Sequence, residues 1–249
     1  AIIGGIHDII SGAFLLTNKE RKVPIEVASY LLGSVQYRGD IDIHEENGKR
    51  YVLGGDIFST ILPDDLNIKF KSKTYENLDS DEAFVIIKNG RLLQGTVDEN
   101  SIGAFKGRIL DRVMRDHGMD AGRAFIDNAT RLGIAAATMF GFTTSINDED
   151  IPDEAQHKIE EGLDDAMKQI QKLVKAFEAG ELESLPGRSI EETLEMEIMR
   201  VTGKARDMAG EIAGEHLGLE NSAVIMAKSG ARGSMLNLSQ MSGIVGQQA

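Results

Sequence analysis

The pattern of apolar residues changes near residue 145, and this change constrains the fold that the chain can adopt. Before that point, short apolar runs alternate with turn signals. After it, apolar residues recur three or four positions apart over long stretches. Short runs bounded by turns are typical of strands and short helices, whereas the longer spacing places side chains on one face of a helix. The sequence therefore predicts an α+β domain over residues 1–145 and a helical domain over residues 146–249.

The first domain contains clear hairpin and helix signals. Asn89-Gly90 joins the two β-rich runs of AFVIIKNGRLLQGTV, and YVLGG follows the ENGK turn at Glu46 to Lys49. An Asn-Gly pair between apolar runs favours a two-residue hairpin turn. The segments IEVASYLLGSV and GRILDRVMRDHG have helical patterns, and Gly118 closes the second. The segment AGRAFIDNATRLGIAAATMFGF continues as a helix whose small residues would allow close packing.

Two apolar stripes predict an antiparallel helical hairpin in the second domain. Their members are Ile159, Leu163, Met167, Ile170, Val174 and Phe177, then Leu194, Ile198, Val201, Ala205, Met208 and Ile212. Ser189 and Glu192 match a capping box for the second helix, and the linker that holds Gly180, Pro186 and Gly187 is short, which favours antiparallel neighbours. The hairpin is either a self-packing structural unit or a projecting arm that partner proteins touch, and periodicity does not separate the two.

Composition excludes several classes of protein. The formal net charge of −13 argues against a broad surface that grips duplex nucleic acid. The absence of cysteine removes disulfides, thiolate catalysis and cysteine-based zinc sites, and the five histidines show no metal-ligand spacing. The apolar opening stretch lacks a basic leading segment, and no run reaches the ~18 apolar residues needed to span a bilayer. We expect a soluble, cytoplasmic protein without a membrane partner, and both ends of the sequence suggest a piece of a longer polypeptide.

One short stretch, AKSGARGSMLNLSQMSG, holds a single arginine, Arg232, in a glycine- and serine-rich loop. Gly230 and Gly233 allow backbone conformations that other residues avoid, and Ser229 and Ser234 add hydroxyl groups. Ser234 is also placed to cap a helix that carries Met235, Leu238 and Met241. A helix N-terminus attracts anions, and arginine offers a planar fork of donors to phosphate. The chemistry alone leaves two interpretations open: a phosphate contact, or an arginine that pairs with a nearby carboxylate.

The same stretch resembles a known family. SGARGSMLNLSQMSGIVGQQ is similar to the segment just before the bridge helix in the largest subunit of multisubunit DNA-directed RNA polymerases. GKARDMAGEIAGEHL resembles the second funnel helix of that subunit, and MFGFTTSINDE resembles the entry to the funnel. GGIHDIISGAFLLT resembles the start of the pore region. The resemblance covers essentially the whole chain and is greatest to the archaeal A′ subunit.

The resemblance implies a function and a set of site residues. Residues 1–145 would form the pore domain and residues 146–249 the funnel domain of a secondary channel, through which nucleotides enter and a backtracked RNA 3′ end leaves. Arg232 would contact the nucleotide triphosphate, with Ser229, Gly230, Gly233 and Ser234 in support. The residues expected to face the channel or the bridge helix are Arg206, Gln240, Gln247 and Gln248. The implied partners are other polymerase subunits, nucleoside triphosphates, the RNA 3′ end and the transcript-cleavage factor, which would approach the funnel.

The family's catalytic parts are absent from the sequence. Neither the metal-binding aspartate loop of the form NADFDGD nor the bridge helix or trigger loop is present. The resemblance therefore implies a piece of a nucleotidyltransferase with no catalytic residue, metal site or cofactor of its own, and with Mg²⁺ held by residues outside this chain. We expect the purified chain to be folded but inactive as a polymerase. The alternative function is a non-catalytic α+β scaffold with a helical arm for protein interactions.

Overall fold

Both Asn-Gly pairs form hairpin turns in the computed structural model, which describes residues 3–75, 77 and 79–246. The first turn joins β2 (His44–Glu46) to β3 (Lys49–Leu53), and the second joins β5 (Phe84–Lys88) to β6 (Arg91–Gln94). Both central residues of each turn have positive φ, 53° and 74° in the first and 48° and 70° in the second. These are the angles of the type I′ turn that matches the twist of paired strands. The predicted hairpin at Asn89-Gly90 and the predicted turn at Glu46 to Lys49 are both confirmed.

A third strand completes each sheet. β1 (Lys22–Pro24) pairs antiparallel with β3, so the first sheet has the order β1-β3-β2. β4 (Ile68–Lys71) pairs antiparallel with β5, so the second has the order β4-β5-β6. The inward side chains of the central strands are buried, including Val52 in the first sheet and Val85 and Ile87 in the second. Two small antiparallel sheets combined with helices make the fold α+β, as predicted.

Helices surround these sheets and share one core with them. They are α1 (Asp8–Thr17), α2 (Ile25–Ser34), α3 (Gly54–Ser59), α4 (Glu99–Ile102) and α5 (Arg108–Phe140), with short 3₁₀ turns η1 (Asn18–Glu20) and η2 (Asp81–Ala83). α1 packs against α5 at a close crossing, because a Cβ on Gly12 would lie 1.8 Å from the Gly133 carbonyl oxygen. The expected close packing of small residues is therefore confirmed. Gly118, with φ 84°, interrupts α5 where the sequence predicts a helix end.

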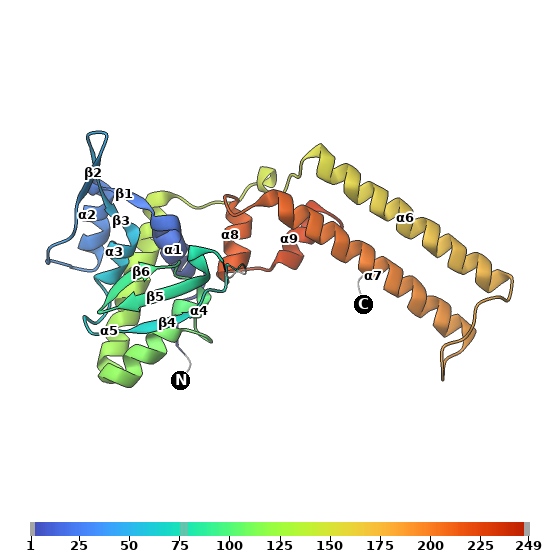
Figure 1. Ribbon diagram of the computed structural model, residues 1–249, viewed down its shortest axis with the longest axis horizontal. Helices are drawn as coiled ribbons and strands as arrows, with labels where there is room; N and C mark the ends of the chain where they lie inside the picture. The colour runs from blue at the N-terminus through green and yellow to red at the C-terminus, as the bar shows by residue number, and fades with distance from the viewer. Residues whose placement is uncertain (1–2, 76, 78, 247–249) are drawn as a thin grey trace. The chain divides into compact units, whose positions relative to one another are not determined.

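The predicted helical hairpin is formed by α6 (Asp153–Glu178) and α7 (Ile190–Leu217), which lie side by side and antiparallel (Figure 1). Ser189 and Glu192 form the expected capping box. Val201 and Ala205 are buried, as a packed seam requires. Met167 is different: its side chain is 56% exposed, so its predicted place in the apolar stripe does not make it part of the seam.

The remaining helices follow or precede this hairpin in the chain. They are η3 (Ile146–Asp148), α8 (Ser222–Ser229) and α9 (Met235–Ser242). α9 packs against α7, where a Cβ on Gly210 would lie 2.7 Å from the Ser239 hydroxyl. None of the helices within the described ranges is both long and apolar enough to cross a membrane.

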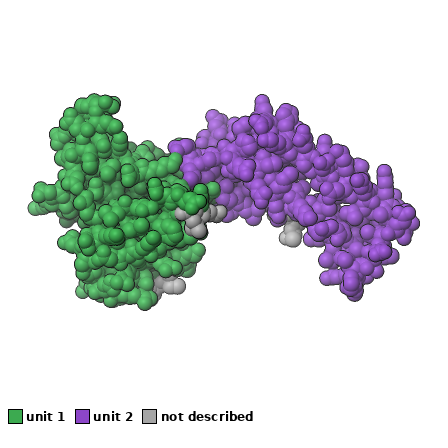
Figure 2. Space-filling model, viewed as in Figure 1, with its two compact units in different colours: residues 1–143, 225–233 green, residues 144–224, 234–249 purple. Residues whose placement is uncertain are grey.

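The chain forms two compact units, and the first is discontinuous in sequence (Figure 2). The first unit consists of residues up to 143 together with 225–233, and the second consists of 144–224 together with the residues from 234 onward. The chain therefore leaves the first unit and returns to it within α8. The predicted domains, two continuous stretches that meet at residue 145, do not include this return.

Candidate functional site

The loop around Arg232 has two glycines in the left-handed region, and each has a different environment. Gly230 has φ 80° and Gly233 has φ 75°. A Cβ on Gly230 would lie 2.5 Å from Glu99 Oε2 and 2.6 Å from Lys73 Nζ, whereas a Cβ on Gly233 would meet nothing within 4 Å. Both positions favour glycine through their backbone angles. At Gly230 there is a second reason for glycine, because the loop backbone there lies directly against the side chains of Lys73 and Glu99.

Residues on either side of Gly230 hold the loop to the first unit. Ser229 is fully buried, and its hydroxyl donates to the Met226 carbonyl and accepts from the Ala231 N–H, both at 3.4 Å. Ala231 is 5% exposed and belongs to the core of the first unit. The Arg232 N–H donates to the Met226 carbonyl at 3.2 Å. The Ser229 hydroxyl is therefore used inside the loop, where its two hydrogen bonds hold the loop backbone.

A buried carboxylate organises the surface on which the loop lies. Asp98 is fully buried and caps the N-terminus of α4. It accepts hydrogen bonds from the Ser72 hydroxyl at 2.7 Å, the Lys73 N–H at 2.6 Å and the Thr74 N–H at 3.2 Å. The Thr74 hydroxyl in turn donates to the carbonyl of Lys228 at 3.4 Å. Residues 72–74, 98 and 228 are thereby joined into one network.

Sequence reasoning missed this network. The run DENS over residues 98–101 carries an N-cap signal that could have identified Asp98 as a cap. No local pattern indicates that residues 72–74 and 98–99 meet residues 228–230, because the contacts join segments that are distant in sequence.

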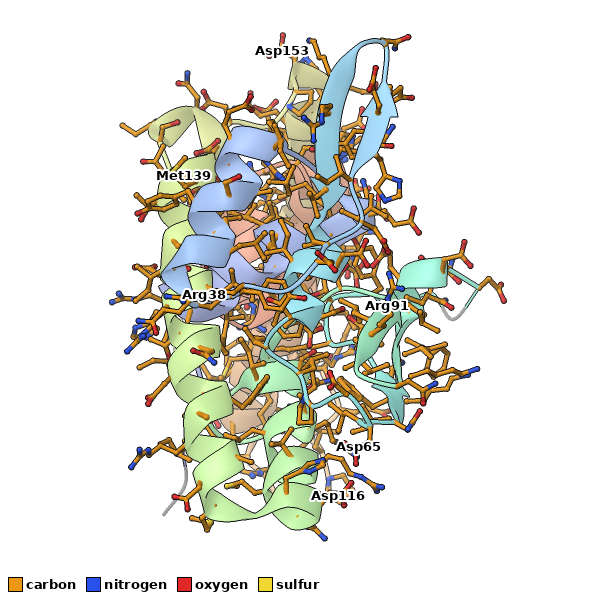
Figure 3. All side chains as sticks on the ribbon, turned by 90° about the vertical axis from the view of Figure 1, so that its left-hand side faces the viewer. Arg38, Asp65, Arg91, Asp116, Met139 and Asp153 are labelled. Carbon is orange, nitrogen blue, oxygen red and sulfur yellow. The ribbon has the colours of Figure 1, made fainter. Side chains whose placement is uncertain are left out.

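The Arg232 side chain is exposed. Its guanidinium forms no hydrogen bond or ion pair with any residue that the structure describes. Arg91, labelled in Figure 3, is by contrast an arginine paired with carboxylates: its Nη2 lies 2.9 Å from Asp42 Oδ2 and 3.0 Å from Asp56 Oδ1. Exposed arginines are common on protein surfaces. Arg232 combines a backbone that the loop holds in place with side-chain donors that are available to an external anion.

Ser234 belongs to the second unit and caps α9, as predicted. Its hydroxyl oxygen accepts from the Asn237 N–H at 3.3 Å, and the hydroxyl donates to Asn237 Oδ1 at 2.7 Å. The hydroxyl is therefore engaged by the helix. Its role is to define where α9 begins.

The other predicted site residues also lie in the second unit. Arg206 on α7 is half-buried, and its Nη2 lies 2.8 Å from Asp207 Oδ1. Its aliphatic stem packs against Gly246, where a Cβ would lie 2.7 Å from Arg206 Cγ. Gln240 is half-buried on α9, which packs against α7. The predicted residues Gln247 and Gln248 lie outside the described residues.

The chemistry that the loop offers is that of its arginine. Arg232 supplies hydrogen-bond donors and a permanent positive charge. No group of three or more His, Cys, Asp or Glu side chains in the described part of the chain is placed to hold a metal ion.

Comparison with known proteins identifies the family. Residues 1–149 match the family model described as RNA polymerase Rpb1, domain 3, and residues 173–249 match RNA polymerase Rpb1, domain 4. The chain is 47% identical over its full length to the DNA-directed RNA polymerase subunit Rpo1N of Methanothermobacter thermautotrophicus, and covers 29% of that subunit. It is 43% identical, again over its full length, to the Rpo1N subunits of Thermoplasma acidophilum and Halobacterium salinarum, and covers 29% and 25% of them. The chain thus spans less than a third of the length of these relatives. It belongs to the Rpb1 family, the largest-subunit family of RNA polymerases.

Proposed function

We propose that this chain forms the pore and funnel of a secondary channel in a DNA-directed RNA polymerase, and that Arg232 contacts the triphosphate of the incoming nucleotide. The channel would admit nucleotides and release the 3′ end of backtracked RNA. The observation that carries the proposal is a guanidinium that has no hydrogen-bond or ion-pair partner among the described residues, on a loop whose backbone is held by internal contacts. Membership of the Rpb1 family and the resemblance of the Arg232 motif to the family's segment before the bridge helix support it.

The chemistry of the contact follows from the arginine side chain. Its planar fork can form two parallel hydrogen bonds to phosphate oxygens, and these charge-assisted bonds are stronger than neutral ones. Gly230 and Gly233 contribute by allowing the loop conformation, and Ser229 contributes by anchoring it. This division of roles gives the chain a part in substrate binding.

In this function the chain would bind substrate and would carry out no bond-making step. The sequence lacks an NADFDGD-type loop, so the Mg²⁺ ions of the reaction would be held by residues elsewhere in the polymerase. The chain would act in the assembled enzyme beside other polymerase subunits, and the transcript-cleavage factor would approach the α6–α7 hairpin.

The test replaces Arg232 in polymerase assembled with the full-length subunit. A charge-assisted contact contributes about 1.5–3 kcal/mol, so Arg232→Ala should reduce efficiency at low nucleotide concentration by roughly 10- to 150-fold. Arg232→Lys should recover part of the loss, since it keeps the charge and loses the fork. The measurement is elongation rate against nucleotide concentration. Arg112→Ala is the control, because Arg112 is exposed and pairs with Asp116 on its own helix.

Equal efficiency in all four enzymes would favour a second candidate function, a non-catalytic scaffold whose helical arm contacts partner proteins. One feature of the hairpin favours that candidate. Met167, Met196 and Met199 are 56%, 41% and 40% exposed on α6 and α7. Flexible methionine side chains suit surfaces that bind proteins.

A further inference from the structure

The backbone of the Arg232 loop lies on an ion pair that joins two distant parts of the first unit. Lys73 Nζ and Glu99 Oε2 are 2.5 Å apart. A Cβ added to Gly230 would lie within 2.7 Å of three atoms of this pair: Glu99 Oε2, Lys73 Nζ and Glu99 Cβ. The backbone of Gly230 therefore lies directly against the pair.

The pair is itself held in place at both ends. Lys73 donates its backbone N–H to the buried Asp98 carboxylate, and Glu99 is the first residue of the helix that Asp98 caps. The side chains of Lys73 and Glu99 are 35% and 20% exposed. Their attraction is therefore screened less by solvent than that of a fully exposed pair. The backbones that carry Lys73 and Glu99 are therefore held in place, and partial burial favours the contact between the two charged groups.

The chain from Gly230 to Arg232 is short and constrained. Ala231 is buried in the core, and the Arg232 N–H is bonded to Met226. A shift of Gly230 would have to displace these contacts and would move the Arg232 backbone with it. Small displacements of a substrate-contact group can cost large factors in rate.

We propose that the Lys73–Glu99 ion pair is the positioning element of the Arg232 loop and sets how well Arg232 reaches the nucleotide triphosphate. The inference rests on the proposed function of Arg232 and assigns the pair a role that acts through Arg232. Neither Lys73 nor Glu99 is a catalytic residue in this proposal.

The pair could act through its charge or through its position, and these two explanations predict opposite effects of Glu99→Gln on substrate use. If only the local charge mattered, Glu99→Gln would leave Lys73 unneutralised and improve the use of an anionic substrate, while Lys73→Met would worsen it. If the pair acts by position, both variants release the surface under Gly230, and both should worsen substrate use. Glu99→Gln therefore separates position from charge.

The experiment uses polymerase assembled with the full-length subunit and measures elongation rate against nucleotide concentration. Glu99→Gln and Lys73→Met should each raise the nucleotide KM by roughly tenfold, with a smaller change in kcat. In an Arg232→Ala background the same substitutions should add almost nothing, because their effect passes through Arg232. Lys22→Met and Glu46→Gln are matched controls, since that pair has the same 2.5 Å separation but joins β1 to β2 and is 52% and 55% exposed.

The outcomes distinguish the two proposals. If Arg232→Ala itself leaves the KM unchanged, the proposed function fails and this inference fails with it. If Arg232→Ala raises the KM but the pair variants do not, or if Glu99→Gln lowers the KM, the inference alone is overturned. Full additivity with Arg232→Ala would also overturn it, since the pair would then act independently of Arg232. A kcat that changes much less than the KM in the pair variants would show that the enzyme is assembled.

Discussion

At the scale of single residues, the two glycines that flank Arg232 are required for different reasons. Both have positive φ, which disfavours any residue with a Cβ. Only at Gly230 would that Cβ also collide with neighbouring atoms. The same substitution at both positions therefore separates backbone strain from steric overlap.

We expect Gly230→Ala to destabilise the first unit more than Gly233→Ala does. The strained backbone should cost about 1–2 kcal/mol at either position, and overlap with the Lys73–Glu99 pair should add about 1–3 kcal/mol at Gly230. The measurement is urea unfolding followed by tyrosine fluorescence. The protein has no tryptophan, and its four tyrosines, at positions 30, 37, 51 and 75, all lie in the first unit.

Gly233→Ala serves as the control in that experiment. Equal losses for the two variants would mean that the ion pair moves aside freely and does not fix the loop.

At the scale of elements, α7 contacts two different helices. Val201 and Ala205 are buried in the α6–α7 hairpin region, whereas Gly210 and Gly214 face Ser239 and Met235 of α9. The predicted stripe is therefore only part of what α7 buries. Small residues at positions 209, 210, 213 and 214 allow the second contact, and their spacing carries no signal for a particular partner helix.

We expect Val201→Asp to unfold the hairpin and Met167→Asp to leave it intact. Val201 is 8% exposed, so an aspartate there would bury an unpaired charge and cost several kcal/mol, on the order of 3–5. Met167 belongs to the predicted stripe but is 56% exposed, so its replacement should change stability by about 0.5 kcal/mol or less. Thermal unfolding followed by helical circular dichroism measures both variants.

A parent-like melt for Val201→Asp would mean that the two helices do not form a packed seam. A large loss of stability in Met167→Asp would instead mean that Met167 packs in the seam, in contradiction to its exposure in the structure.

At the scale of the whole molecule, the first unit is completed by residues that come late in the sequence. Residues 225–233 belong to it, and Ala231 lies in its core. The Thr74 hydroxyl also donates to the carbonyl of Lys228, so the late segment is hydrogen-bonded to the early one. A chain that ends at residue 143 lacks all of these contacts.

We expect a fragment of residues 1–143 to be less stable in its tyrosine-reported transition than a fragment of residues 1–233. The loss should be roughly 1–3 kcal/mol, because apolar burial and buried hydrogen bonds disappear together. Urea unfolding of the two fragments gives the comparison. Identical midpoints would show that residues 225–233 contribute nothing to the first unit.

The sequence allowed the local features to be predicted and left the long-range ones undetected. The Asn89-Gly90 turn, the interruption at Gly118 and the Ser234 cap follow from the preferences of neighbouring residues, and all are confirmed. Met167 was misplaced because three-and-four periodicity defines a stripe that is wider than the seam. The base of the Arg232 loop was missed because Lys73 and Glu99 meet Gly230 only through tertiary packing.

The discontinuous first unit also affects the order of events during synthesis on the ribosome. After residue 143 emerges, residues 144–224 must be translated before the completing segment is made. At ~5–20 residues per second this delay lasts on the order of 4–16 seconds. During that time the core of the nascent unit lacks Ala231, and the Thr74 hydroxyl cannot donate to the Lys228 carbonyl. Until this late segment has been made, the nascent first unit would be less stable than the finished one.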